Sequence, residues 1–168
     1  KLRHKGAVGK PHANRCVIHL MVAIKRRFGL GENEWRAGHA FDASRHVVIP
    51  GLINTHHHFY QTLTRAHPKA INKELFDWLK ALYPVWARLT PESLRLATRL
   101  ALAELLMSGV TTTSDHHYVF PKGLDDAMDI QVDEARRLGM RMTVTRGSMN
   151  LSVKDGGLPP DSVVQDED

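Results

Sequence analysis

From about residue 47 onward, short apolar runs alternate with longer stretches in which apolar positions recur every three or four residues. The short runs predict β-strands and the recurring positions predict helices. The predicted strands cover residues 47–54, 110–114 and 140–145. The first of them is apolar almost throughout, which predicts a buried strand. Residues 1–40 show weak periodicity and support only a possible short element at 17–24.

The stretch between the first two strands predicts two helices, preceded by a loop or helical turn at 59–68. Asn72 can cap the first helix, and Pro84 should end or kink it. The apolar stripe of this helix consists of Leu75, Phe76, Leu79 and Leu82. The second helix has a strong start at Thr90-Pro91-Glu92, because threonine can cap and proline suits the first helical position. Residues 94–107 are apolar on most of the circumference, so we expect this helix to be well buried.

A third helix is predicted before the last strand, and Gly139 should end it. One side of this amphipathic helix is marked by Leu124, Met128, Gln131, Ala135 and Leu138. The order strand, helix, strand, helix, strand is typical of parallel strands joined by right-handed crossovers. We therefore expect an α/β fold with functional groups at the carboxyl ends of the strands. The strands alone do not distinguish a barrel from an open sheet.

Composition narrows the class of protein. The chain has 168 residues, of which 42% are hydrophobic and 24% charged, as in an ordinary globular domain. Its single cysteine, Cys16, excludes an intrachain disulfide and a multi-cysteine zinc cluster. No apolar run approaches the roughly 20 residues that span a membrane, and the sequence carries no recognisable secretory signal. We therefore expect no membrane association and a cytoplasmic location.

The net charge of +5 is unevenly distributed. Residues 1–46 hold 10 Lys or Arg against 3 Asp or Glu, whereas residues 47–168 hold 13 against 15. A basic arm can bind nucleic acid, but these basic residues form neither a helical stripe nor an aromatic-interleaved pattern. Nucleic-acid binding is therefore not expected. The chain divides into a poorly defined basic segment, 1–46, and a folded part, 47–168.

Three histidines follow the first predicted strand directly, in the order His56-His57-His58. Side chains alternate faces along a strand, so His56 and His58 should point to one side and His57 to the other. Two imidazoles on one face can reach a single metal ion, and a catalytic zinc takes about three protein ligands plus water. The pattern predicts half of a metal site.

These histidines are part of a longer set of motifs. The set comprises Phe41-Asp42-Ala43, the run from His46 to Ala66, Trp78-Leu79, Arg88-Leu89-Thr90-Pro91 and the run from Gly109 to Tyr118. Together they resemble the aminohydrolase branch of the amidohydrolase superfamily, which includes guanine, 8-oxoguanine and S-adenosylhomocysteine deaminases and triazine hydrolases. The likeness is greatest to the 8-oxoguanine deaminases and covers roughly residues 41–168.

The resemblance implies a metal-dependent (β/α)₈ TIM barrel with one divalent ion, usually zinc, held in part by His56 and His58. The metal activates a water, the hydroxide attacks an amino-bearing ring carbon of a purine-like heterocycle, and ammonia leaves. It also implies substrate-binding roles. Gln61 matches a position that hydrogen-bonds the base, Trp78 a pocket-lining tryptophan, and His117 a contact at the mouth of the second strand. The alternatives from the residues alone are a loop glutamine, a core tryptophan and a role for His116 instead.

The same resemblance implies groups that this sequence lacks. The family takes a third histidine with a nearby glutamate, a further histidine and an aspartate from strands five, six and eight, so no catalytic residue is expected within this chain. A closed barrel takes about 250 residues. We therefore expect a partial barrel of about the first three βα units.

Three interpretations of the function stay open at this stage. The full-length parent is expected to deaminate an 8-oxoguanine- or guanine-like heterocycle and could form a homo-oligomer. Alternatively, the chain is a non-catalytic fragment, or its parent is a related triazine or cyclic-amide hydrolase. The zinc-dependent cytidine deaminases are excluded because the sequence has neither His-x-Glu nor Cys-x-x-Cys.

Overall fold

The computed structural model describes residues 45–165. The possible element at 17–24 and nearly all of the basic segment 1–46 lie outside these residues, so the division after residue 46 stays a prediction. Residues Gly51–Asp168 form a compact unit, and the fold described below is that of this unit. None of the helices in the described part is long and apolar enough to cross a membrane.

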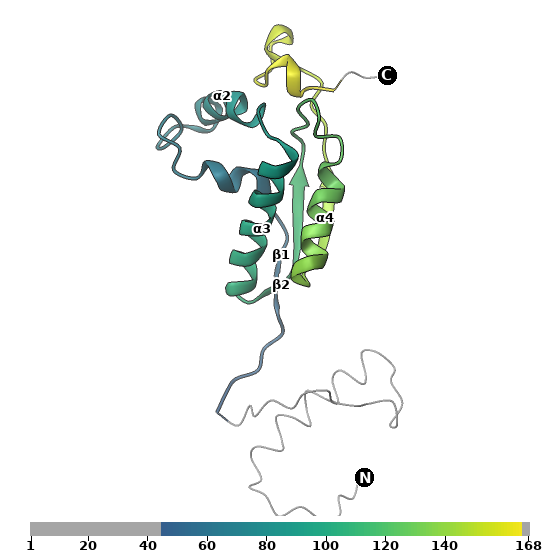
Figure 1. Cartoon of the computed structure of the whole chain (residues 1–168). Helices are drawn as coiled ribbons and strands as arrows, with labels where there is room; N and C mark the ends of the chain where they lie inside the picture. Colours follow the sequence, from purple (N-terminus) through teal and green to yellow (C-terminus); the bar gives the residue numbers. More distant parts are fainter. Residues whose placement is uncertain (1–44, 166–168) are drawn as a thin grey trace, which may run out of the picture. The chain divides into compact units, whose positions relative to one another are not determined.

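The unit is built on three parallel strands in the order β1-β2-β3. The strands are β1 (Leu52–Asn54), β2 (Val110–His117) and β3 (Arg141–Arg146), and the helices are α2 (Leu75–Trp86), α3 (Pro91–Met107) and α4 (Ala127–Leu138). Single 3-10 turns form η1 (Phe59–Thr64), η2 (Val153–Asp155) and η3 (Asp161–Val163). Helix α2 and the yellow C-terminal turns lie at the end of the unit to which β2 points (Figure 1). The predicted parallel α/β order is confirmed.

The first strand is shorter and more exposed than predicted. Only Leu52–Asn54 is extended and paired, and Val47 and Ile53 are 89% and 69% exposed. The prediction of a buried strand over 47–54 is wrong because, within the described sheet, β1 pairs with β2 on one side only. At its start a Cβ on Gly51 would lie 2.2 Å from the Thr111 hydroxyl oxygen, so only glycine fits this approach.

Helix α2 begins later than predicted. The residue before its first turn is Glu74, whereas Asn72 lies outside the helix with a left-handed φ of 59°. The predicted Asn72 cap is therefore wrong. Pro84 does not end the helix either, which continues to Trp86. Proline lacks the N–H that would donate to the carbonyl four residues earlier, so it weakens the preceding turn without stopping the two helical residues that follow it.

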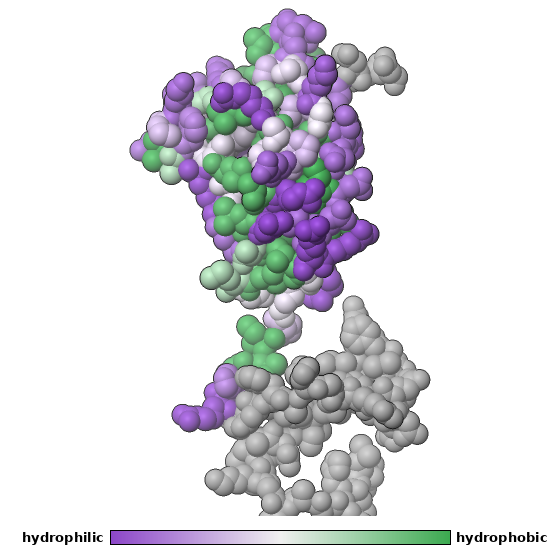
Figure 2. All heavy atoms as spheres, in the orientation of Figure 1, coloured by the Kyte–Doolittle hydropathy of each residue, from purple (hydrophilic) through white to green (hydrophobic). Residues whose placement is uncertain are grey.

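Helix α3 has the predicted cap but not the predicted burial. Thr90 accepts a hydrogen bond from the Ser93 amide, and the Ser93 hydroxyl accepts one from the Thr90 amide, which closes a capping box. One face is buried, while Leu96, Leu100 and Met107 are 50%, 43% and 89% exposed. Figure 2 shows hydrophobic surface over α3 and hydrophilic surface over α4. The expectation of a well-buried helix is wrong, because the helices and sheet described here cover only one face of α3.

Helices α3 and α4 are joined by an ion-pair cluster. The Glu134 carboxylate, 1% exposed, accepts hydrogen bonds from Arg95 at 3.2 Å and from Arg99 at 2.9 and 3.1 Å.

Helix α4 ends as predicted at Gly139, whose φ of 71° is the left-handed conformation that glycine adopts without strain.

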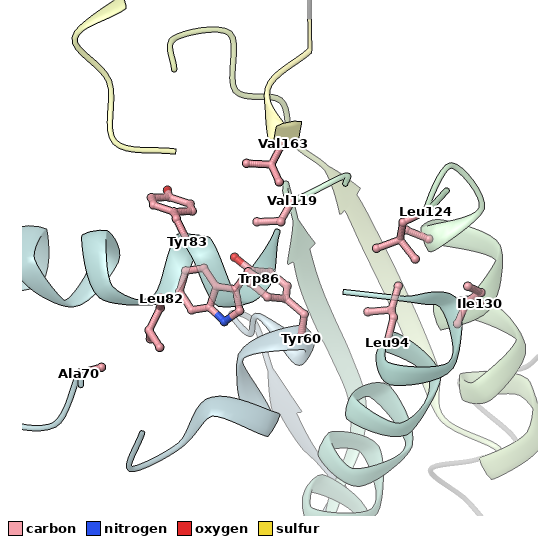
Figure 3. Packing of buried hydrophobic residues seen from close by; sticks show 11 residues of the cluster. Tyr60, Ala70, Leu82, Tyr83, Trp86, Leu94, Val119, Leu124, Ile130 and Val163 are labelled. Atoms are coloured by element: carbon pink, nitrogen blue, oxygen red, sulfur yellow. The ribbon is translucent and has the colours of Figure 1, made fainter. Parts of the chain in front are cut away.

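The core lies in two clusters on the helical side of the sheet. The larger one gathers Tyr60 of η1 and the aromatic residues of α2 with apolar residues after β2, and Figure 3 shows Trp86 beside Tyr60 with Val119 and Val163 above them. The smaller cluster comprises Phe59, Ala101, Leu102, Val110, Ala135 and Met140. Phe59 and Tyr60 directly follow the three histidines, so these two aromatic residues anchor the histidine segment to the core.

Strand β2 is longer than the predicted 110–114 and extends to His117. Its last residues alternate, with Asp115 and His117 fully buried and His116 between them half-buried. The His117 ring donates from Nε2 to the Val119 carbonyl oxygen at 2.8 Å, and its Nδ1 is buried without a partner. Burial lowers the pKa of His117 from 6.5 to about 4, outweighing that hydrogen bond.

We predict that His117 makes the stability of this chain depend on pH. Its pKa is depressed in the folded state, so its contribution is complete above pH 6.5 and is lost as the pH falls through about 4. The shift corresponds to at most about 3 kcal/mol of unfolding free energy. His117→Gln, which keeps a donor for Val119, should flatten this slope in urea unfolding followed by tryptophan fluorescence.

Asp115 has the opposite slope, because burial raises its pKa from 3.8 to about 6. Wild type and His117→Gln share Asp115, so the difference between them isolates the histidine. Parallel curves for the two proteins from pH about 4 to 7 would contradict the prediction.

Candidate functional site

The histidine segment runs on from β1 and keeps the alternation of a strand. The ring centroids of His56 and His58 lie 4.8 Å apart, edge to face. The His57 ring instead lies 4.8 Å from the Phe59 ring, on the side that faces the core. The backbone still pairs with β2 at this point, because the His116 amide donates to the His57 carbonyl oxygen at 2.8 Å.

His116 joins the pair from the neighbouring strand. Its ring stacks on His56 with centroids 4.6 Å apart and lies 6.1 Å from the His58 ring. The backbone carbonyl of His116 can only accept, so His58 donates to it from Nδ1 at 2.6 Å. This bond fixes the tautomer of His58 and leaves its Nε2 lone pair available for a ligand.

A cavity of about 430 Å³ opens beside His58. Gln61 and Trp78 also line it, so three of the five site residues predicted from the sequence lie around one space. Its other lining residues are His57, Thr62, Thr64, Arg65, Ala66, His67, Ala70, Ile71, Asn72 and Lys73. The volume lies in the range of small-molecule sites, which are about 300–1,000 Å³.

Two of the predicted substrate residues are held by neighbours. The Gln61 amide donates to the Tyr60 hydroxyl at 3.3 Å. The half-buried Trp78 ring packs edge to face on Trp86, with centroids 5.3 Å apart. Trp86 is itself fixed by a hydrogen bond from its indole N–H to the Thr64 hydroxyl at 3.2 Å. One aromatic and one amide side chain are therefore presented to the cavity from packed elements.

The electrostatics favour uncharged imidazoles. Burial lowers the pKa of His58, and the neighbouring His56 and His116 lower it further, against the hydrogen bond to the His116 carbonyl. Burial likewise lowers the pKa of His57, with a further contribution from Arg65. A metal ion binds the neutral form of histidine, so a lowered pKa keeps His58 ready for a cation at neutral pH.

Below the histidines lies a buried carboxylate. Asp115 accepts a hydrogen bond from the Phe59 amide at 2.7 Å and another from the Gln131 side-chain amide at 2.6 Å. Burial raises its pKa to about 6, although both hydrogen bonds favour the ionised form. The Asp115 side chain is thus tied to the backbone of the residue that follows His58.

The described residues suit a divalent metal only in part. His56 and His58 are nitrogen donors on one side of the segment, and the tautomer of His58 is the one that leaves Nε2 unprotonated. Among residues 45–165, however, no group of three or more His, Cys, Asp or Glu side chains is arranged to hold a metal. This part of the chain thus provides two imidazole ligands of a site that needs more.

The fifth predicted site residue lies elsewhere. His117 is fully buried, 5.3 Å from the Tyr60 ring and 4.9 Å from the Phe120 ring, and it does not line the cavity. His116 is the residue brought to the histidine pair. The sequence prediction chose His117 over His116 because it ended β2 too early. Since β2 extends to His117, side chains alternate from the buried Thr113, and this alternation assigns positions 115 and 117 to the core.

Known proteins are similar to this chain in sequence. Residues 47–167 match the family model described as the amidohydrolase family. The 8-oxoguanine deaminase of Pseudomonas aeruginosa is 68% identical over 126 residues, 75% of this chain and 28% of that protein. Isoxanthopterin deaminase from an unknown prokaryotic organism is 39% identical over 108 residues, 63% of this chain and 22% of that protein. The chain therefore spans about a quarter of the length of these relatives.

Solved structures agree with the sequence relatives. The atrazine chlorohydrolase TrzN from Arthrobacter aurescens TC1, crystallised with zinc, superposes with a TM-score of 0.63 at 34% identity, over 68% of this chain and 27% of that one. The fold is thus part of a metal-dependent hydrolase barrel, as predicted. Because the family model covers the strands, the histidine pair and the cavity, this chain belongs to the amidohydrolase family.

Proposed function

We propose that the full-length protein hydrolytically deaminates an aminated purine of the 8-oxoguanine or guanine type, with this chain supplying the first part of its active site. The observation that carries the proposal is the cavity lined by His58, Gln61 and Trp78 beside the His56–His58 pair. The 68% identity to an 8-oxoguanine deaminase supports the purine class.

The cavity residues suit a flat heterocycle. A tryptophan face can stack on a base, an interaction worth about 1–3 kcal/mol per base. The Gln61 amide offers both a donor and an acceptor, which match the alternating groups along a purine edge. Together Trp78 and Gln61 would fix the plane and the rotation of the ring, so that the amino-bearing carbon faces His56 and His58.

His56 and His58 are the proposed ligands of one divalent ion, for which we favour zinc. Bound there, the ion would supply a Lewis acid that lowers the pKa of water from 15.7 to about 7. The chain's own part is to present two imidazoles, of which His58 has a lowered pKa, and to hold the substrate beside them. The remaining ligands and the general base are proposed to come from later strands of the full-length protein, which we place in the cytoplasm.

A triazine hydrolase is the second candidate. A hydroxydechloroatrazine ethylaminohydrolase of Pseudomonas sp. is 36% identical over 73% of this chain, close to the 34% of TrzN. The lower identity favours the purine class, and turnover of the two substrate classes separates them.

We expect the full-length protein to release ammonia from 8-oxoguanine or guanine faster than it releases chloride or amine from a triazine. The measurement is kcat/KM for each substrate, with ammonia and chloride quantified directly. A preference for the triazine would replace the purine proposal with the second candidate.

His56→Ala and His58→Ala should each abolish metal retention in the full-length protein. Losing a partner outside the first ligand sphere costs about 10–100-fold in metal affinity or activity, so losing a ligand should cost more than about 100-fold. Elemental analysis after dialysis and ammonia release give the two readouts. The matched control is His46→Ala, which removes an imidazole outside the segment 56–58; unchanged zinc content in either ligand variant would refute the assignment.

The 168-residue chain by itself should retain zinc weakly and deaminate nothing. Two imidazoles fall short of the three protein ligands of a catalytic zinc, and the described residues offer no third. Purified chain is assayed for ammonia release with zinc added, alongside the full-length protein. Measurable turnover by the short chain would show that the described residues suffice.

A further inference from the structure

We propose that Asp115 is a positioning residue: its carboxylate, held by Gln131 of α4, fixes the backbone that carries His58 and so sets the orientation of the His56–His58 pair. The role in metal binding rests on the proposed function, whereas the effect on the histidine ring does not. The argument starts from the contacts that β2 makes with the histidine segment.

Asp115 reaches the histidine segment through one backbone amide. Phe59 is the first residue of η1, and no side chain of its own segment caps that turn. The Asp115 carboxylate accepts the Phe59 amide at 2.7 Å from across the sheet and so acts as the missing cap. The point where the extended segment turns into η1 is therefore set by a residue of β2.

His116, the next residue of β2, makes two further hydrogen bonds to the histidine segment. The His116 amide donates to the His57 carbonyl oxygen at 2.8 Å, and the His116 carbonyl accepts His58 Nδ1–H at 2.6 Å. Residues 115 and 116 thus hold the backbone on both sides of His58 and one nitrogen of its ring. A shift at Phe59 would lengthen the ring bond and release the His58 tautomer.

A carboxylate buried at position 115 costs folding free energy that an apolar side chain would not cost. Asp115 is fully buried, and its carboxylate accepts hydrogen bonds from the uncharged amides of Phe59 and Gln131. Burying a charge opposes folding unless hydrogen bonds compensate it, and an apolar residue would pack at lower cost. The carboxylate is best explained by what it holds.

Gln131 supplies the other end of the anchor. Its Nε2 donates to Asp115 at 2.6 Å, while its Oε1 is buried without a partner. In Asp115→Asn, Oδ1 can still accept the Phe59 amide, and a rotated Gln131 amide can accept from the asparagine Nδ2. The conservative variant therefore keeps both hydrogen bonds, whereas Asp115→Ala loses both.

The first measurement uses the metal-free full-length protein labelled with ¹⁵N-histidine, its His58 signal assigned by loss in His58→Ala. We expect the Nδ1–H tautomer of His58 in wild type and Asp115→Asn, and a mixed tautomer in Asp115→Ala. The second measurement is zinc affinity by competition with a chromophoric chelator, expected to fall about 10–100-fold in Asp115→Ala and to recover in Asp115→Asn.

The matched control is Glu134→Ala, which removes a second buried carboxylate that ties α3 to α4 and contacts none of the histidines. It should lower the melting temperature and leave the His58 tautomer and zinc affinity unchanged. A wild-type tautomer in Asp115→Ala, or an equal effect of Glu134→Ala, overturns the proposal. If the wild-type protein binds no zinc, the proposed function is overturned instead. The ¹⁵N signals of the His58 ring still decide whether Asp115 positions that ring.

Discussion

The alignment of β2 with the segment that follows β1 is the constraint on which the site depends. Its clearest expression is the hydrogen bond from the His116 amide to the His57 carbonyl oxygen. That bond extends the parallel pairing beyond the short β1 and keeps the histidine segment extended, so its side chains alternate. If the segment slipped by one residue, His57 would replace His56 and His58 on the open side.

The two faces of the sheet are chemically different because helices cover only one of them. On the covered side, β2 buries Asp115 and His117 among the residues of η1, α4 and the loop after β2. On the other side, the half-buried His116 meets His56 and His58. Parallel β/α proteins place chemistry at the carboxyl ends of strands, and these histidines lie there.

Much of the fold could be predicted from the sequence because local rules decided it. The Thr90 cap, the left-handed Gly139 and the parallel order of the strands all follow from residues close in the chain. Exposure of β1 and α3 could not be predicted, because burial depends on which other elements pack there. Asn72 failed as a cap for a related reason: it adopts a left-handed turn, and the helix begins only after Glu74.

In the candidate site, too, the features set by local rules could be predicted from the sequence, and those set by long-range packing could not. The His56–His58 spacing needs only alternation along one strand, and the structure brings the two rings together. The choice between His116 and His117 needed the length of β2, which the run of threonines did not reveal. Asp115 needed still more, since its partners Phe59 and Gln131 lie 56 and 16 residues away in the sequence. Its carboxylate could equally well have capped a local loop.

The incomplete metal site and the exposed apolar surface have one explanation under the proposed partial barrel. Leu52 and Ile53 of β1 are 50% and 69% exposed, and the same sheet offers two imidazoles where a catalytic metal needs three protein ligands. Further parallel strands would pair with β1, bury its side chains and bring ligands to the same end of the sheet. Metal binding and closure of the barrel would then be coupled, because each later strand adds both core and ligand, and the free energy of one would stabilise the other. Asp115 does not take part in this coupling, because its partners Phe59 and Gln131 lie within the described residues. It can therefore orient the first two ligands before the later strands bring the others.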